Sequence, residues 1–151
     1  MKIPNKVMIA GIGYDIIMKD ELYNAQTHDS LNAQISYSDR EIKIATQQCY
    51  ILGDSDHHVS VNDDVMQRAF FHELWHGYCN AISETKITNE QNACTFAILC
   101  VEQISDGIDF RNWQKKAFSN MIDMGFVKLT DVQKKKMLWL IDKTTYVVAE
   151  D

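Results

Sequence analysis

The first half of the chain alternates apolar and polar residues in short runs that predict β-strands. Lys6–Ala10 and Tyr14–Met18 are rich in β-branched and aliphatic residues, and a glycine-containing bend separates them. A second hairpin is predicted where Ile35–Tyr37 and Ile42–Ile44 alternate on either side of a polar turn at residues 38–41. The N-terminal half is therefore expected to form a small sheet.

Beyond this region the apolar spacing changes to a helical period. Cys49–Leu52 is expected to be one more short strand, followed by a polar loop over Gly53–His58. Four helices are predicted from apolar stripes and terminal signals: Val65–Ala81, Thr88–Ser105, Phe110–Met124 and Thr130–Lys143. The final Tyr146–Val148 is compatible with a short strand or a frayed end.

Capping signals support two of these helices. Thr88 with Gln91 and Thr130 with Gln133 have the spacing of a capping box, and Gly107 is an expected helix stop. Strands that come first and helices that follow are typical of the α+β class, which is the fold class we predict.

Length and composition indicate one domain. With 151 residues, of which 46% are hydrophobic and 24% charged, the chain resembles an ordinary globular protein. One proline and six glycines form no linker-like stretch. We expect a single domain over 1–151, with a core at 1–108 and a C-terminal helical extension at 109–151.

Charge and cysteine usage narrow the cellular setting. The net charge of −6 repels a phosphate backbone, so no nucleic-acid partner is expected. No window has the roughly 18 apolar residues of a membrane span, and the N-terminus lacks a secretory apolar core. None of the four cysteines has C-x-x-C spacing, and Cys79, Cys94 and Cys100 fall in helices expected to be buried. These features predict a cytoplasmic protein with reduced thiols and no membrane partner.

The first predicted helix carries an H-E-x-x-H motif at His72-Glu73-Leu74-Trp75-His76. The two histidines lie about 40° apart on a helix and one turn from each other, so both imidazoles can reach one ion. Glu73 is offset by about 100° from His72, which places a carboxylate beside the ion without making it a ligand. Such a carboxylate can accept a proton from metal-bound water.

The rest of this helix is apolar on nearly all sides, which predicts that it is buried. Phe70, Leu74 and Gly77 fall on one side, and Phe71 and Trp75 fall on another. Two histidines and a glutamate are then forced into the interior, where an unsatisfied polar group costs about 1–3 kcal/mol. A bound cation would satisfy all three side chains.

A hydrolytic zinc site needs a third protein ligand. The metzincin pattern requires a histidine six residues after His76, but Ile82 occupies that position. Glu90 is the best candidate, because antiparallel packing of the next helix would bring its first turn level with His76. The alternatives are Cys79, Glu84, His57 and His58.

The sequence resembles the small zincin-type metallopeptidases of phages and mobile elements, which are related to the ImmA/IrrE group. The resemblance covers about residues 30–100 and is carried by the β region Ile35–Ala45, the helix Gln67–His76, and the stretch Glu90–Ala97. The last stretch is similar to the family's glutamate helix. Cys94 departs from the pattern, since such sequences often have Asn or Asp there.

The resemblance implies a zincin-like fold, in which the motif helix packs under a small sheet whose edge strand can align an extended peptide. It implies His72, His76 and Glu90 as zinc ligands and Glu73 as the general base and acid. The segment 109–151 has no counterpart in this family.

We therefore expect a zinc-dependent metallopeptidase that acts on a peptide or protein substrate. A second donor would support the oxyanion, and the sequence does not rank the candidates: Tyr37, Tyr50, His57, His58 and Tyr78. One alternative is a binding module in which zinc only stabilises the fold and which docks a partner such as a repressor. Another is a metal-free adaptor.

Overall fold

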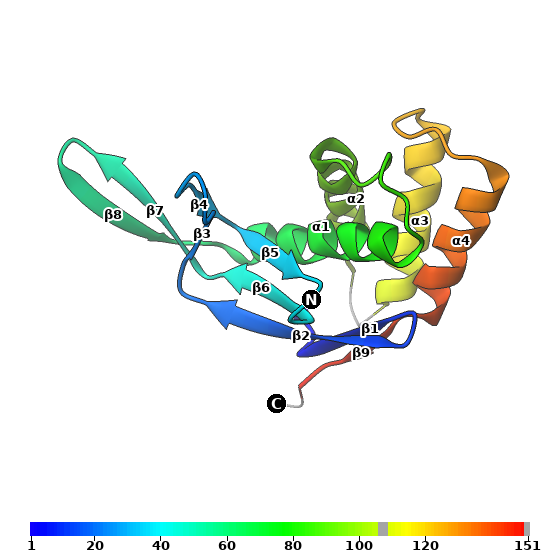
Figure 1. Ribbon diagram of the computed structural model, residues 1–151, viewed down its shortest axis with the longest axis horizontal. Helices are drawn as coiled ribbons and strands as arrows, with labels where there is room; N and C mark the ends of the chain where they lie inside the picture. The colour runs from blue at the N-terminus through cyan, green and yellow to red at the C-terminus, as the bar shows by residue number, and fades with distance from the viewer. Residues whose placement is uncertain (106–108, 150–151) are drawn as a thin grey trace.

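The computed structural model describes residues 1–105 and 109–149 and shows an α+β fold, as the sequence predicted. In chain order the elements are β1 (Lys6–Ile9), β2 (Ile12–Lys19), β3 (Leu22–Tyr23), β4 (Ser30–Leu31), β5 (Ala33–Ser36), β6 (Glu41–Ala45), β7 (Gln47–Leu52), β8 (Ser55–Ser60), α1 (Asp63–Ala81), α2 (Glu90–Glu102), α3 (Phe110–Asp123), α4 (Asp131–Lys143) and β9 (Thr145–Val147). Figure 1 shows α1 between the strands and the other three helices. Among the described residues, no helix is long and apolar enough to cross a membrane.

The main sheet has five strands in the order β5-β6-β2-β1-β9. Both hairpins expected from alternation are present: β1 pairs with β2, and β5 pairs with β6 with Ile35 opposite Ile42. β2 and β6 run parallel, whereas the other neighbours are antiparallel. β5 therefore forms one edge of the sheet, and this edge lies along α1.

The predicted loop over residues 53–58 is wrong, because most of it is strand. β7 and β8 form a two-stranded hairpin with Tyr50 opposite His57, and the two rings stack with centroids 5.2 Å apart. Gly53 makes the turn with a φ of +68°, a conformation that glycine adopts without strain. The hairpin projects from the body (Figure 1), and both of its faces are largely exposed, so apolar alternation could not identify β8.

The helix boundaries follow local capping. Thr130 and Gln133 form the predicted capping box of α4. The capping box predicted at Thr88 is wrong, because Asn89 is the N-cap of α2 and accepts a hydrogen bond from the backbone N–H of Asn92. α2 ends at Glu102, and the predicted stop at Gly107 lies outside the described residues.

The core is built around α1, whose large apolar side chains are buried as predicted. Phe70, Phe71 and Trp75 have no exposed surface, and they pack in one hydrophobic cluster with the sheet and the other helices. Gly77 faces the sheet so closely that an added Cβ would lie 2.8 Å from Cδ1 of Ile9. Because Gly77 has no side chain, α1 packs closely against Ile9 of β1 and Ile35 of β5.

The C-terminal segment belongs to the same core. Phe110, Trp113 and Met121 of α3 are buried in the cluster that contains the side chains of α1. β9 adds to the sheet by pairing with β1. Behind it, the Tyr78 hydroxyl donates a hydrogen bond to the side-chain oxygen of Gln114 in the interior.

The close approach at Gly77 makes a testable prediction. Gly77→Val should lower the free energy of unfolding by about 1–3 kcal/mol, because the added methyl groups must displace Ile9 from a packed site. Asn80→Val is the matched control, because it introduces the same residue on the exposed side of α1 and should change stability by less than about 0.5 kcal/mol. Urea unfolding followed by circular dichroism measures both, and equal destabilisation would contradict the inferred packing.

Candidate metal centre and cleft

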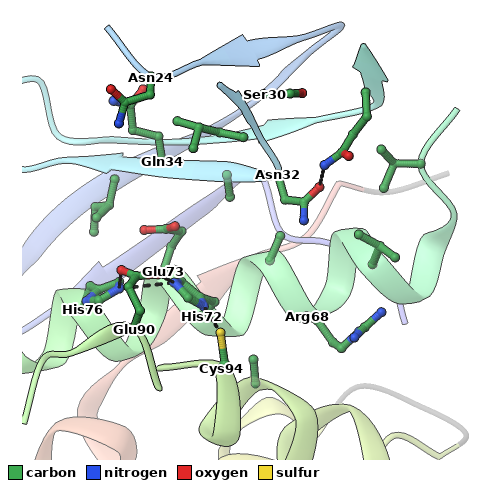
Figure 2. Close-up of a pocket in the computed structure, with 18 of the residues that line it drawn as sticks. Asn24, Ser30, Asn32, Gln34, Arg68, His72, Glu73, His76, Glu90 and Cys94 are labelled. Carbon is green, nitrogen blue, oxygen red and sulfur yellow. Dashed lines mark hydrogen bonds and ion pairs between the residues drawn. The ribbon is translucent and has the colours of Figure 1, made fainter. Parts of the chain in front are cut away.

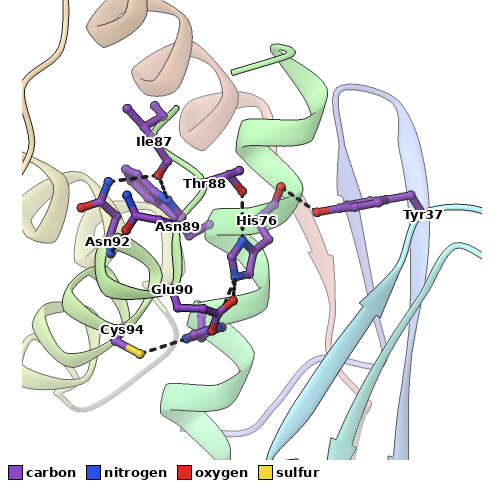
Figure 3. A network of polar contacts seen from close by, with 10 residues as sticks. Tyr37, His76, Ile87, Thr88, Asn89, Glu90, Asn92 and Cys94 are labelled. Atoms are coloured by element: carbon purple, nitrogen blue, oxygen red, sulfur yellow. Dashed lines mark hydrogen bonds and ion pairs between the residues drawn. The ribbon is translucent and has the colours of Figure 1, made fainter. Parts of the chain in front are cut away.

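Three side chains with metal-ligating atoms converge between α1 and α2. Nε2 of His72 lies 2.9 Å from Oε2 of Glu90, and Nε2 of His76 lies 2.9 Å from Oε1 of the same carboxylate. The two Nε2 atoms are 3.2 Å apart. Within the described part of the chain, this is the one group of three such residues whose ligand atoms all lie within 4.8 Å of one another. Figure 3 shows the imidazole of His76 turned toward the Glu90 carboxylate.

The loop between α1 and α2 positions Glu90. The indole N–H of Trp75 donates a 2.8 Å hydrogen bond to the carbonyl oxygen of Ile87, and the side-chain amide of Asn92 donates a second bond to the same oxygen at 3.1 Å. Because Trp75 belongs to α1 and Asn92 to α2, Ile87 ties the two helices together just before Glu90 begins α2. Trp75, whose side chain is buried in the core, therefore also holds this loop in place.

The Nδ1 atom of each imidazole has a partner of its own. Nδ1 of His76 lies 3.0 Å from the hydroxyl oxygen of Thr88, and Nδ1 of His72 lies 3.5 Å from the sulfur of Cys94. When Nδ1–H donates to such an acceptor, the Nε2 lone pair faces the centre, which is the tautomer that a metal ligand needs. Thr88 and Cys94 thus orient the two rings.

Burial distinguishes the histidines from the glutamate. The side chains of His72 and His76 are 18% and 12% exposed, whereas that of Glu90 is 77% exposed. Burial lowers the pKa of His72, and the neighbouring His76 lowers it further, while Glu90 acts in the opposite direction. The neutral imidazole, which binds metals, is favoured at His72.

Glu73 lies next to the two histidines on the side of α1 that faces β5, as Figure 2 shows. It is 6% exposed, and burial, with a contribution from the charge of Glu90, raises its pKa to about 8. A hydrogen bond from the backbone N–H of Ile35 partly offsets this rise. A buried carboxylate with one backbone donor is a stronger base than an exposed one.

The alternative third ligands lie apart from this group. Burial raises the pKa of Cys79 to about 12, which disfavours the thiolate that a metal would require. Glu84 accepts a 2.8 Å hydrogen bond from Gln133 of α4. His57 and His58 lie on β8, where His57 stacks on Tyr50 and His58 contacts Glu21.

A cleft of about 1170 Å³ opens beside the three ligands. One wall consists of α1 and α2, and the other consists of β4, β5 and the base of the β7–β8 hairpin. Figure 2 shows the amides of Asn32 and Gln34 on the strand side and His72, Glu73 and His76 along the helix. The volume is above the range of about 300–1,000 Å³ that is usual for small-molecule sites.

Of the five suggested oxyanion donors, two line this cleft, namely Tyr37 and Tyr50. The Tyr37 hydroxyl donates a 3.3 Å hydrogen bond to the carbonyl oxygen of His76, so it lies next to the motif. Burial, and then the charge of Glu73, raise the pKa of Tyr37 to about 12, so the phenol stays protonated. Tyr78 is fully buried against Gln114.

Sequence reasoning missed two residues at this site. Thr88 was assigned to a capping box, but its side chain contacts His76. Cys94 was expected to be buried in its helix, but it is exposed and contacts His72. For Cys94 the available signal was its spacing, because a residue four positions after Glu90 lies on the same face of α2. Thr88 lies in the loop just before Glu90.

The chain matches no family model, curated protein or solved structure in our comparisons.

The contact between Thr88 and His76 generates a prediction about metal affinity. Thr88→Val removes the hydroxyl with little change in volume and should weaken Zn²⁺ binding by about 10–100-fold, because His76 loses the partner that orients it. Thr95→Val is the control, since the Thr95 hydroxyl bonds only to the backbone of α2 at Gln91. Competition with a colorimetric zinc chelator measures both affinities, and equal values for the two variants would argue against the orienting role.

Proposed function

We propose that this protein is a zinc-dependent peptidase of the zincin type that hydrolyses peptide bonds in a protein or peptide substrate. The observation that carries the proposal is the convergence of His72, His76 and Glu90 on one point, with the Glu73 carboxylate beside them at an open cleft. The resemblance of residues 30–100 to phage and mobile-element metallopeptidases supports the same conclusion.

The donor set fits zinc in chemistry and in spacing. Imidazole nitrogen and carboxylate oxygen bind Zn²⁺ at about 2.0–2.2 Å, so two donors on a tetrahedral ion are about 3.3 Å apart. The separations of 2.9, 2.9 and 3.2 Å between His72, His76 and Glu90 are close to this value. Slight opening of the three side chains would therefore admit the ion.

His72, His76 and Glu90 would hold the ion beside the cleft, and zinc bound there would supply the Lewis acidity that activates water and polarises a carbonyl group. Glu73 takes a proton from the attacking water on its carboxylate and delivers it to the leaving amine nitrogen. A bound cation would offset the charge of Glu90, which contributes to the raised pKa of Glu73, and would so favour the ionised carboxylate.

The walls of the cleft suit an extended peptide. Among the described residues β5 is an edge strand of the main sheet, so its outer backbone groups, apart from the Ile35 N–H that donates to Glu73, can pair with a substrate main chain. Tyr37 follows β5 and carries a protonated hydroxyl next to His76. We assign to the Tyr37 hydroxyl a hydrogen bond to the carbonyl oxygen of the cleaved peptide bond as negative charge develops on that oxygen.

Metal binding provides the first test. Wild-type protein stripped with a chelator and dialysed against Zn²⁺ should take up one equivalent, whereas His72→Ala and Glu90→Ala should lose stoichiometric binding. Cys79→Ser should retain it, because Cys79 does not contribute to the group. Inductively coupled plasma mass spectrometry measures the content, and a wild-type protein that stays metal-free would refute the zinc site.

Catalysis provides the second test. Glu73→Gln should keep its zinc but lower kcat/KM for peptide cleavage by about 10²–10⁴-fold, because the amide cannot accept the proton. Glu84→Gln makes the same change outside the cleft and should retain wild-type activity. Mass spectrometry of a diverse peptide library detects the products. A zinc-loaded wild type that leaves every peptide intact would instead favour the zinc-stabilised binding module.

A further inference from the structure

Two buried polar atoms in the cleft have no partner. Among the described residues, the buried side-chain nitrogens and oxygens that lack a hydrogen bond are Oγ of Ser30 and Nε of Arg68. Both residues line the cleft that holds the candidate metal centre. A buried polar group without a hydrogen bond is destabilising, and a polar ligand that entered the cleft would lie close to both residues.

Arg68 is placed to meet a substrate that lies along α1. It precedes His72 by one helical turn, so Arg68, His72 and His76 follow one another on the same stripe. Figure 2 shows Arg68 beside the cleft, beyond His72 as seen from His76. It is also the one lysine or arginine among the described residues that line the cleft.

The partner that Arg68 does have is a weak one. Its Nη2 atom lies 3.3 Å from Oδ2 of Asp64 one turn earlier on α1, and the two side chains are 42% and 60% exposed. Exposed pairs of this kind one helical turn apart contribute little to stability. An incoming carboxylate can therefore replace Asp64 at little cost and bind the terminal nitrogens of the partly exposed guanidinium.

We propose that Arg68 binds a carboxylate group of the substrate, so that the enzyme selects peptides with an acidic group near the cleaved bond. This inference rests on the proposed peptidase function. Arginine presents a fork of N–H donors that matches a carboxylate in two parallel hydrogen bonds. The Ser30 hydroxyl and the Asn32 amide on the facing wall supply further donors for the same segment.

The helix fixes how far this carboxylate lies from the reacting bond. Four residues of helix span about 6 Å from Arg68 to His72, and the midpoint between the two histidines is about 9 Å away. An extended chain advances about 3.3 Å per residue. The acidic group therefore lies about two to three residues from the cleaved bond, and it is either an Asp or Glu side chain or the C-terminal carboxylate of the peptide.

The test uses ten-residue peptides with randomised sequences, in which one position at a time is fixed as Glu, Gln or Lys. Each set is made with a free and with an amidated C-terminus. Zinc-loaded wild type should show at least about a tenfold preference in one of two comparisons. It should cleave peptides with a fixed Glu faster than those with Gln at the same position, or peptides with a free C-terminus faster than the amidated ones. Loss of preference on amidation identifies a C-terminal carboxylate, whereas dependence on a fixed internal Glu identifies a side chain.

Variants of Arg68 decide whether it is responsible. Arg68→Gln should abolish the preference for an acid over its amide, and Arg68→Glu should shift the preference toward Lys. Asp64→Asn should strengthen the preference for acids, because it removes the competing carboxylate. Arg111→Glu is the control: it makes the same charge change in the first turn of α3, outside the cleft, and should leave the preference unchanged.

A separate binding measurement keeps this inference distinct from the peptidase proposal. Fluorescence anisotropy with the same peptides and zinc-loaded Glu73→Gln reports carboxylate recognition whether or not the wild type cleaves. An acid preference in binding that Arg68→Gln removes would support the Arg68 site even if cleavage failed. Wild-type cleavage without acid preference, or an acid preference that persists in Arg68→Gln, would overturn it.

Discussion

The burial of α1 is the constraint on which the rest of the structure depends. Its apolar faces are covered by the sheet on one side and by α2, α3 and α4 on the others, so its polar residues must find partners within the protein or in a ligand. His72 and His76 find Glu90 on one side, and Glu73 finds the backbone of β5 on another. The burial of α1 thus brings the imidazoles of His72 and His76 and the carboxylate of Glu73 to one cleft, where they meet Glu90 of α2.

The same packing explains why the centre is preorganised. Trp75 fills the space between α1 and α2 and also binds the carbonyl oxygen of Ile87, so the core side chain and the ligand-bearing loop are held by one residue. Thr88, the next residue, orients His76, and Glu90 follows at the start of α2. The loop bonds and the core contacts share Trp75, so the start of α2, which carries Glu90, is held against the buried helix that carries both histidines.

Local signals in the sequence were sufficient for the four helices, for the two hairpins of the main sheet, and for the expectation that His72, His76 and Glu90 lie close together. The i, i+4 spacing fixes the two imidazoles on a rigid helix, and a short connection requires the next helix to pack back against it. Features that depend on tertiary contacts were missed. Asn89 rather than Thr88 caps α2, and the Thr88 hydroxyl contacts His76 instead. β8 is mostly polar, so its pairing with β7 leaves no apolar alternation in the sequence.

The placement of Arg68 on the same helix as the histidines has a consequence for specificity. A recognition residue on a separate loop could move relative to the metal centre, whereas the separation of Arg68 and His72 is set by the hydrogen-bonded backbone of α1. In the proposed complex this spacing limits how far a bound carboxylate can lie from the cleaved bond, and so favours one register of the peptide. The edge strand β5 supports any sequence through its backbone, so selectivity must come from side chains on the opposite wall, where Arg68 is the permanent cation.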